Sequence, residues 1–85
     1  MRIYHVRYVH KVSSSASDVG DDITLTDGDL VDAKTIGAAL RERGTLCKGV
    51  RVREWRIESN GKIVVFPTYP GLSTYWHSVI LTPIF

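Results

Sequence analysis

The chain has 85 residues, of which 44% are hydrophobic and 24% charged, so its length suits one small domain and excludes a second. The formal net charge of +2 neither requires nor excludes a nucleic-acid partner. A single cysteine, Cys47, excludes an internal disulfide framework and a thiolate-rich zinc site, which favours a reducing, cytosolic setting. Residues 63–85 carry no Lys, Arg, Asp or Glu, but prolines interrupt them, so we expect no membrane span.

Charge is distributed unevenly along the chain. Residues 1–12 carry a net charge of +3, residues 13–33 carry −6, and residues 34–62 carry +5. Such blocks predict an acidic end and a basic face on the folded domain, and a solvated surface without any partner is the alternative. The acidic block consists of Asp18, Asp21, Asp22, Asp27, Asp29 and Asp32.

The first predicted element is a strand at about residues 2–12. Tyr4, Val6 and Tyr8 alternate there with His5 and Arg7, which is typical of a strand with one buried face. The serine-rich residues 13–21 show no periodicity, and we expect a mobile loop there. A short second strand is predicted at about residues 22–26.

One helix is predicted at about residues 29–43. Asp27 or Asp29 is expected to cap its first turn, and Gly44 suits the left-handed position after its last turn. Gly37 costs a helix interior about 0.8–1 kcal/mol relative to alanine, so we expect a close approach between helix and sheet at that point. Apolar residues recur at helical spacing at Leu30, Ala33, Ile36 and Leu40.

A β-hairpin is predicted from strands at about residues 50–58 and 62–68. Asn60-Gly61 between them indicates a two-residue type I′ turn. That turn pairs Ile57 with Val64 and Trp55 with Phe66, and we expect the helix to cover this apolar face.

The hairpin also predicts where three arginines lie. Val52 is out of phase with Trp55, so a β-bulge is expected near Arg53-Glu54. With that bulge, Arg51 and Arg56 lie on the sheet face away from the helix, and Arg53 lies beside them.

A last strand is predicted at about residues 75–81. Pro83 is expected to end its pairing, and either Tyr75 or Trp76 is expected to fill the core, because neighbouring strand residues face opposite ways. The predicted fold is therefore a single α+β domain over residues 1–85 in the order ββαβββ. One helix packs on one face of a curved antiparallel sheet of about five strands.

Catalytic and metal-binding chemistry find little support in the sequence. Cys47 has no family-specific motif around it and is expected to be a small buried thiol. His5 and His10 point to opposite faces of one strand and cannot share a metal, and His77 is expected to be a surface or strand histidine. The acidic block lacks the ligand pattern of a calcium loop. We therefore expect no enzyme, no catalytic residue, no cofactor and no metal.

Basic side chains close to aromatic residues favour a binding function. Lys48, Arg51, Arg53 and Arg56 follow the predicted helix, and Tyr69, Tyr75 and Trp76 come later in the chain. Such residues neutralise phosphates and stack on bases, so one hypothesis is a small nucleic-acid-binding regulator that uses a basic sheet face.

Local sequence similarity suggests a second hypothesis. The segments that carry it are Tyr4-His5-Val6-Arg7, residues 30–36 (LVDAKTI), Cys47-Lys48-Gly49 and Val52-Arg53. With the ββαβββ order, residues 4–58 resemble small phage-encoded anti-CRISPR proteins, above all inhibitors of the type I-F system. The resemblance implies a helix packed on a curved antiparallel sheet. It also implies a phage or mobile-element protein that binds backbone subunits of the crRNA-guided surveillance complex (Cascade) where DNA would lie.

The resemblance also implies which residues contact the partner. Lys34 stands where the family has a partner- and DNA-facing helix lysine, whereas Thr35 replaces a second base, which leaves the CRISPR subtype and target subunit open. The expected partners are Cas subunits of a type I complex in the cytoplasm of the host bacterium, with weak non-specific DNA binding, no membrane, and a monomer or weak dimer. The expected partner-binding residues are Lys34, Lys48, Arg51, Arg53 and Arg56.

Overall fold

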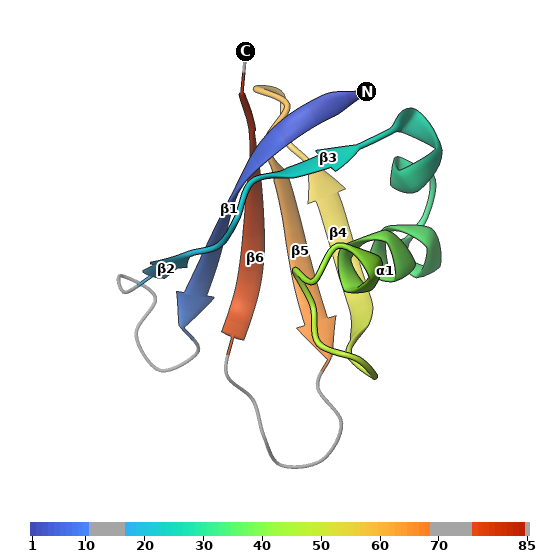
Figure 1. Cartoon of the computed structure of the whole chain (residues 1–85), viewed down its shortest axis with the longest axis vertical. Coiled ribbons are helices and arrows are strands. Elements are labelled where there is room, and N and C mark those ends of the chain that lie inside the picture. The colour runs from blue at the N-terminus through green and yellow to red at the C-terminus, as the bar shows by residue number, and fades with distance from the viewer. Residues whose placement is uncertain (11–16, 69–75, 85) are drawn as a thin grey trace.

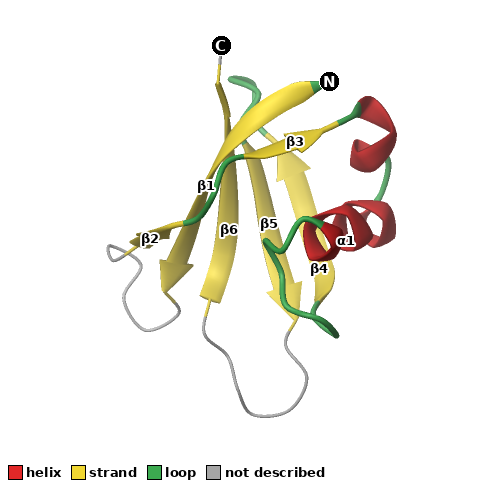
Figure 2. Ribbon diagram, in the orientation of Figure 1, coloured by secondary structure: helices red, strands yellow, loops and turns green. Residues whose placement is uncertain are grey.

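In the part of the chain that the structure describes, six antiparallel strands form one sheet in the order β2–β1–β6–β5–β4, and β3 pairs with the same edge of β1 as β2 does. The computed structural model describes residues 1–10, 17–68 and 76–84 (Figure 1). The one α-helix packs against this sheet, which confirms the predicted α+β class (Figure 2). The elements are β1 (Arg2–His10), β2 (Ser17–Val19), β3 (Ile23–Leu25), the 3₁₀-helix η1 (Asp27–Leu30), α1 (Ala33–Glu42), β4 (Arg51–Ile57), β5 (Ile63–Thr68) and β6 (Trp76–Ile84).

The hydrophobic core lies between α1 and one face of the sheet, which we call the inner face. Ile36 and Leu40 of α1 are fully buried there, together with Tyr4 of β1 and Val65 of β5. Side chains alternate along a strand, so the intervening residues point to the opposite, outer face. Arg7 of β1 is exposed on that outer face.

The predicted helix over residues 29–43 is divided into two. η1 ends at Leu30 and α1 begins at Ala33, because Asp32 adopts an extended backbone and its Oδ1 accepts a hydrogen bond of 2.7 Å from Thr35 N. The prediction that Asp27 or Asp29 caps the helix is therefore wrong for α1. Asp29 instead accepts a hydrogen bond from Thr26 N within η1. A short polar side chain that competes for backbone donors is the physical reason for the break.

Two glycines of the helical segment have the roles expected of them. Gly44 adopts a φ of +78° after the helix. A Cβ placed on Gly37 would lie 3.3 Å from Val52 Cγ2, so α1 and β4 are closer there than a side chain comfortably allows. The mid-helix glycine thus serves helix–sheet packing.

The predicted register of the β4–β5 hairpin is wrong by one residue. Ile57 lies opposite Ile63 and Trp55 lies opposite Val65, whereas Phe66 lies opposite Glu54. The turn has three residues rather than two: Glu58 N donates to Lys62 O, and only Gly61, at φ +83°, takes a positive φ. Since a one-residue shift turns every side chain of a strand over, Val64 and Phe66 lie on the outer face.

The bulge predicted in β4 is confirmed, with the pairing shifted between Val52 and Glu54. Val52 consequently packs against the core together with Trp55, which is half-buried rather than fully covered by the helix. Arg53 occupies the bulge itself.

The ends of several strands differ from the prediction. Ser17–Val19 of the expected loop pair with β1, which raises the strand count from five to six. Pro83 does not end the pairing of the last strand, because Pro83 lies opposite Tyr4 and Ile84 opposite Ile3 in β1. The last strand is therefore longer than expected. Residues 11–12 of the expected first strand, residues 13–16 of the expected loop, Tyr69 and Tyr75 fall outside the described residues.

Candidate binding site along the β4 edge

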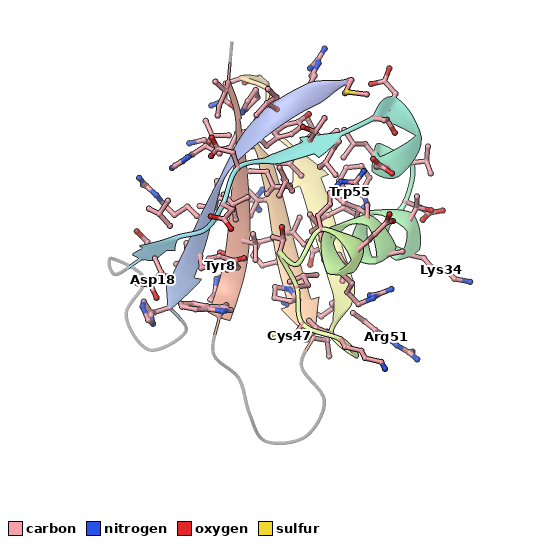
Figure 3. All side chains as sticks on the ribbon, in the orientation of Figure 1. Tyr8, Asp18, Lys34, Cys47, Arg51 and Trp55 are labelled. Atoms are coloured by element: carbon pink, nitrogen blue, oxygen red, sulfur yellow. The ribbon has the colours of Figure 1, made fainter. Side chains whose placement is uncertain are left out.

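Basic side chains gather where α1 packs beside β4, the last strand of the sheet. One hollow of about 630 Å³ lies between these two elements. It is lined by Lys34 and Arg41 of α1, by Arg51 of β4, and by Ala33 and Val52. In Figure 3, Lys34 and Arg51 project on the side of the molecule opposite Asp18. We call this feature, defined by Lys34, Arg41 and Arg51, the basic hollow.

One cation of the basic hollow, Arg41, is held by the backbone rather than by an acidic partner. Arg41 Nη1 donates a 2.7 Å hydrogen bond to Val50 O, which fixes its guanidinium against the start of β4. Lys34 and Arg51 are exposed. Among the described residues, none of the ion pairs within 4.0 Å involves Lys34, Arg41 or Arg51. The hollow therefore concentrates positive charge that suits an anionic group, although Asp32, whose pKa is lowered mainly by the Thr35 N–H and also by Lys34, is an acidic neighbour of Lys34.

Two more arginines of β4 lie around an aromatic ring on the outer face. Arg53 Cζ lies 6.0 Å and Arg56 Cζ lies 5.5 Å from the centre of the Phe66 ring. The His77 ring meets Phe66 edge-on, with centres 5.6 Å apart at 90°. The Arg56 guanidinium also lies 3.9 Å from a Glu58 carboxylate oxygen. We call Arg53, Arg56, Phe66 and His77 the Phe66 cluster.

The five predicted partner-binding residues thus fall into three groups. Lys34 and Arg51 meet in the basic hollow, whereas Arg53 and Arg56 belong to the Phe66 cluster. Lys48 is exposed in the turn between α1 and β4. Arg51 lines the basic hollow together with residues of α1. The bulge at Arg53 lets both Val52 and Trp55 pack against the core, so Arg51 and Arg56 both alternate to the outer side of β4.

Three members of these groups are not among the predicted partner-binding residues: Arg41, Phe66 and His77. Arg41 follows Lys34 by about two helical turns, and this spacing predicts that the two residues lie on the same side of the helix. A two-residue hairpin turn predicts Phe66 on the covered face, and the observed three-residue turn places it on the outer face. Only the turn geometry places its ring outside.

The acidic block is divided between two places: Asp18 and Asp22 lie beside β1, whereas Asp29 and Asp32 lie by α1. His5 Nδ1 lies 3.0 Å from Asp22 Oδ1, and His10 Nε2 lies 3.8 Å from Asp18 Oδ2, so both histidines of β1 face carboxylates. Asp29 lies 3.2 Å from Arg43, whose Nε also donates to Thr24 O. These contacts connect the acidic segment to β1 and to the end of α1.

Cys47, Tyr8 and Trp76 lie outside the basic hollow and the Phe66 cluster. Cys47 is exposed, so the expectation of a buried thiol is wrong: the residue lies in the turn after α1, while Leu46 beside it fills the core. Burial raises the pKa of the Tyr8 hydroxyl, which donates a 2.8 Å hydrogen bond to Thr45 O. Trp76 is half-buried against the Tyr8 ring, 5.1 Å away between centres. Within residues 1–10, 17–68 and 76–84, no group of three or more metal-ligating side chains comes together.

Comparisons with protein-family models, with curated proteins and with solved structures found no match for the chain. In the part of the chain that the structure describes, no helix has the length and apolar character needed to cross a membrane.

Proposed function

We propose that this domain is a non-enzymatic anti-CRISPR protein of phage or mobile-element origin that binds a type I surveillance complex and blocks target DNA binding. The observation that carries the proposal is the basic hollow. Lys34, the residue that the family resemblance marks as partner-facing, lines it together with Arg41 and Arg51. A position identified from sequence similarity is therefore part of a concentrated charge rather than an isolated surface lysine.

The physical argument concerns what such a charge does. Lys34 and Arg51 are exposed and contribute little to folding stability, so folding does not explain why they lie beside Arg41. Arginine is among the residues that dominate binding energy at protein interfaces, and it forms bidentate contacts with carboxylates and phosphates. The guide RNA of such a complex supplies phosphates along the path of the target DNA. A domain docked there through the basic hollow would occupy the place of the DNA.

A phage-plating assay tests the proposal. The chain is co-expressed with type I-C, type I-E or type I-F systems that target a phage, and plaque formation is counted. We expect plating to be restored in at least one subtype. The double variant Lys34→Glu/Arg51→Glu should lose this effect, whereas Arg2→Glu/Lys62→Glu, which changes the net charge equally outside the hollow, should keep it.

Soluble expression of each variant, measured by immunoblot and by a cooperative thermal transition, separates loss of binding from loss of folding. Full retention of immunity in all three subtypes, with the wild-type chain expressed and folded, would contradict the proposal.

A further inference from the structure

The outer face of the sheet carries a second set of groups that the proposed function does not use. Its strands place cations at both sides of an apolar centre. The register gives one row straight across four strands: Arg56 lies opposite Val64, Val64 opposite Ile80, and Ile80 opposite Arg7. Neighbouring strands are about 4.8 Å apart, so this row separates the two arginines by roughly 14 Å.

The Phe66 cluster lies beside this row. Phe66 is half-buried, and the guanidinium groups of Arg53 and Arg56 lie 5.5–6.0 Å from the ring centre, at the outer limit of a cation–π contact. Both arginines are exposed, so they turn aside at little cost. The His77 ring packs against the Phe66 ring at 90°, with ring centres 5.6 Å apart.

The charge on this face favours an anionic ligand. The face carries three arginines, Arg7, Arg53 and Arg56, and two glutamates, Glu54 and Glu58. The Glu58 carboxylate lies 3.9 Å from the Arg56 guanidinium. His5 is directed to Asp22 and His77 contacts Phe66. Among the described elements, α1 and η1 both pack on the inner side, so neither lies over this row.

We propose that the outer face binds single-stranded nucleic acid, with a base stacked on Phe66 and phosphates held by Arg53, Arg56 and Arg7. An aromatic ring on an open sheet, flanked by arginines, is the arrangement that recognises unpaired bases without sequence preference. A duplex keeps its bases stacked inside and offers this ring nothing to stack on. The preference for single strands therefore distinguishes stacking from simple attraction of phosphates.

Fluorescence anisotropy with labelled oligonucleotides of about ten nucleotides, DNA and RNA, tests the proposal against duplexes of equal length. At low salt we expect single strands to bind more tightly than duplexes. Phe66→Leu, which keeps apolar volume but removes the ring, should weaken single-strand binding about 5- to 100-fold, and Phe66→Tyr should retain it. Arg56→Gln should reduce the slope of log affinity against log salt by about 0.7, while Arg2→Gln should leave affinity and slope nearly unchanged.

Three results would overturn this inference: no single-strand binding at low salt, equal affinity for duplex and single strand, or unchanged binding by a folded Phe66→Leu. Thermal denaturation of each variant checks folding. This outcome is independent of the proposed function, because the two proposals are tested with different variants and different measurements. The Lys34 and Arg51 variants are tested by plaque counts, whereas the Phe66 variants are tested by oligonucleotide affinity. If Phe66→Leu loses Cascade binding and the wild type binds no oligonucleotide, the outer face is a protein interface and this inference is wrong.

Discussion

Ile57 lies directly opposite Ile63 in the antiparallel pairing of β4 with β5. Next to this pair, Glu58 N donates to Lys62 O, so the turn consists of the three residues 59–61. Within this turn Gly61 adopts a φ of +83°. The register also directs Phe66 outward, within 6.0 Å of both Arg53 and Arg56. One backbone turn therefore decides which aromatic ring the outer face presents.

The turn makes Gly61 sensitive to substitution. Gly61→Ala should lower the free energy of unfolding by about 1–2 kcal/mol, because an alanine resists the left-handed conformation. Its Cβ would also lie 3.3 Å from Pro83 Cγ. Urea denaturation followed by circular dichroism measures the change. Gly28→Ala is the matched control: Gly28 has no positive φ and its Cβ would lie 3.7 Å from the nearest side-chain atom, so stability should change far less.

Core and edge apolar residues should respond differently to truncation. Leu40 is 0% exposed, so Leu40→Ala should cost about 2–5 kcal/mol, from lost burial and the cavity left behind. Ile57 is 54% exposed although it alternates in phase with Trp55, and Ile57→Ala should cost less than about 1 kcal/mol. Urea denaturation of both variants checks this order. Equal losses would show that Ile57 is covered in the folded protein in solution.

Asp32 should make the stability of α1 depend on pH. The hydrogen bond from the Thr35 backbone N–H is the main cause that lowers the pKa of this carboxyl in the folded state. A folded pKa below the unfolded value of about 3.9 means that the carboxylate stabilises the fold above about pH 4. That contribution is lost as the pH falls through the folded pKa.

Asp32→Ala should accordingly lower the Tm by several degrees at pH 7, and its difference from the wild type should shrink at pH 3. Asp27→Ala, which removes an exposed aspartate of η1, should change the Tm much less. A Tm difference for Asp32→Ala that is the same at both pH values would show that the carboxylate does not act through its charge. Thermal melts followed at 222 nm provide the comparison.

Much of the fold was predictable because its signals are local and periodic. The alternation of Tyr4 and Val6 with His5 and Arg7 located β1, and the helical spacing of Ile36 and Leu40 located α1. The bulge followed from Val52 being out of phase with Trp55. The division of the helix was not predictable by spacing, since it depends on which aspartate captures a backbone donor, and the chain offers three near that point: Asp27, Asp29 and Asp32.

The candidate site was predictable only in part, because some of its side-chain directions depend on how strands pair and how elements pack rather than on local sequence. The outward direction of Arg56 follows from its position next to Trp55 within one strand. The direction of Phe66 depends on pairing between strands, where an error of one residue reverses the face. The meeting of Lys34 with Arg51 depends on tertiary packing at Gly37, and sequence similarity identified the lysine without its neighbours.

The central claim is that the basic hollow binds a type I surveillance complex in place of DNA. Its most direct test is biolayer interferometry with immobilised type I-C, I-E and I-F complexes, first with the purified chain and then with target duplex DNA. We predict that the wild-type chain binds at least one complex and prevents subsequent DNA binding, and that Arg2→Glu/Lys62→Glu does the same while Lys34→Glu/Arg51→Glu does neither. A folded wild-type chain that binds none of the complexes, or a Lys34→Glu/Arg51→Glu variant that binds and blocks DNA as well as the wild type, would contradict the account.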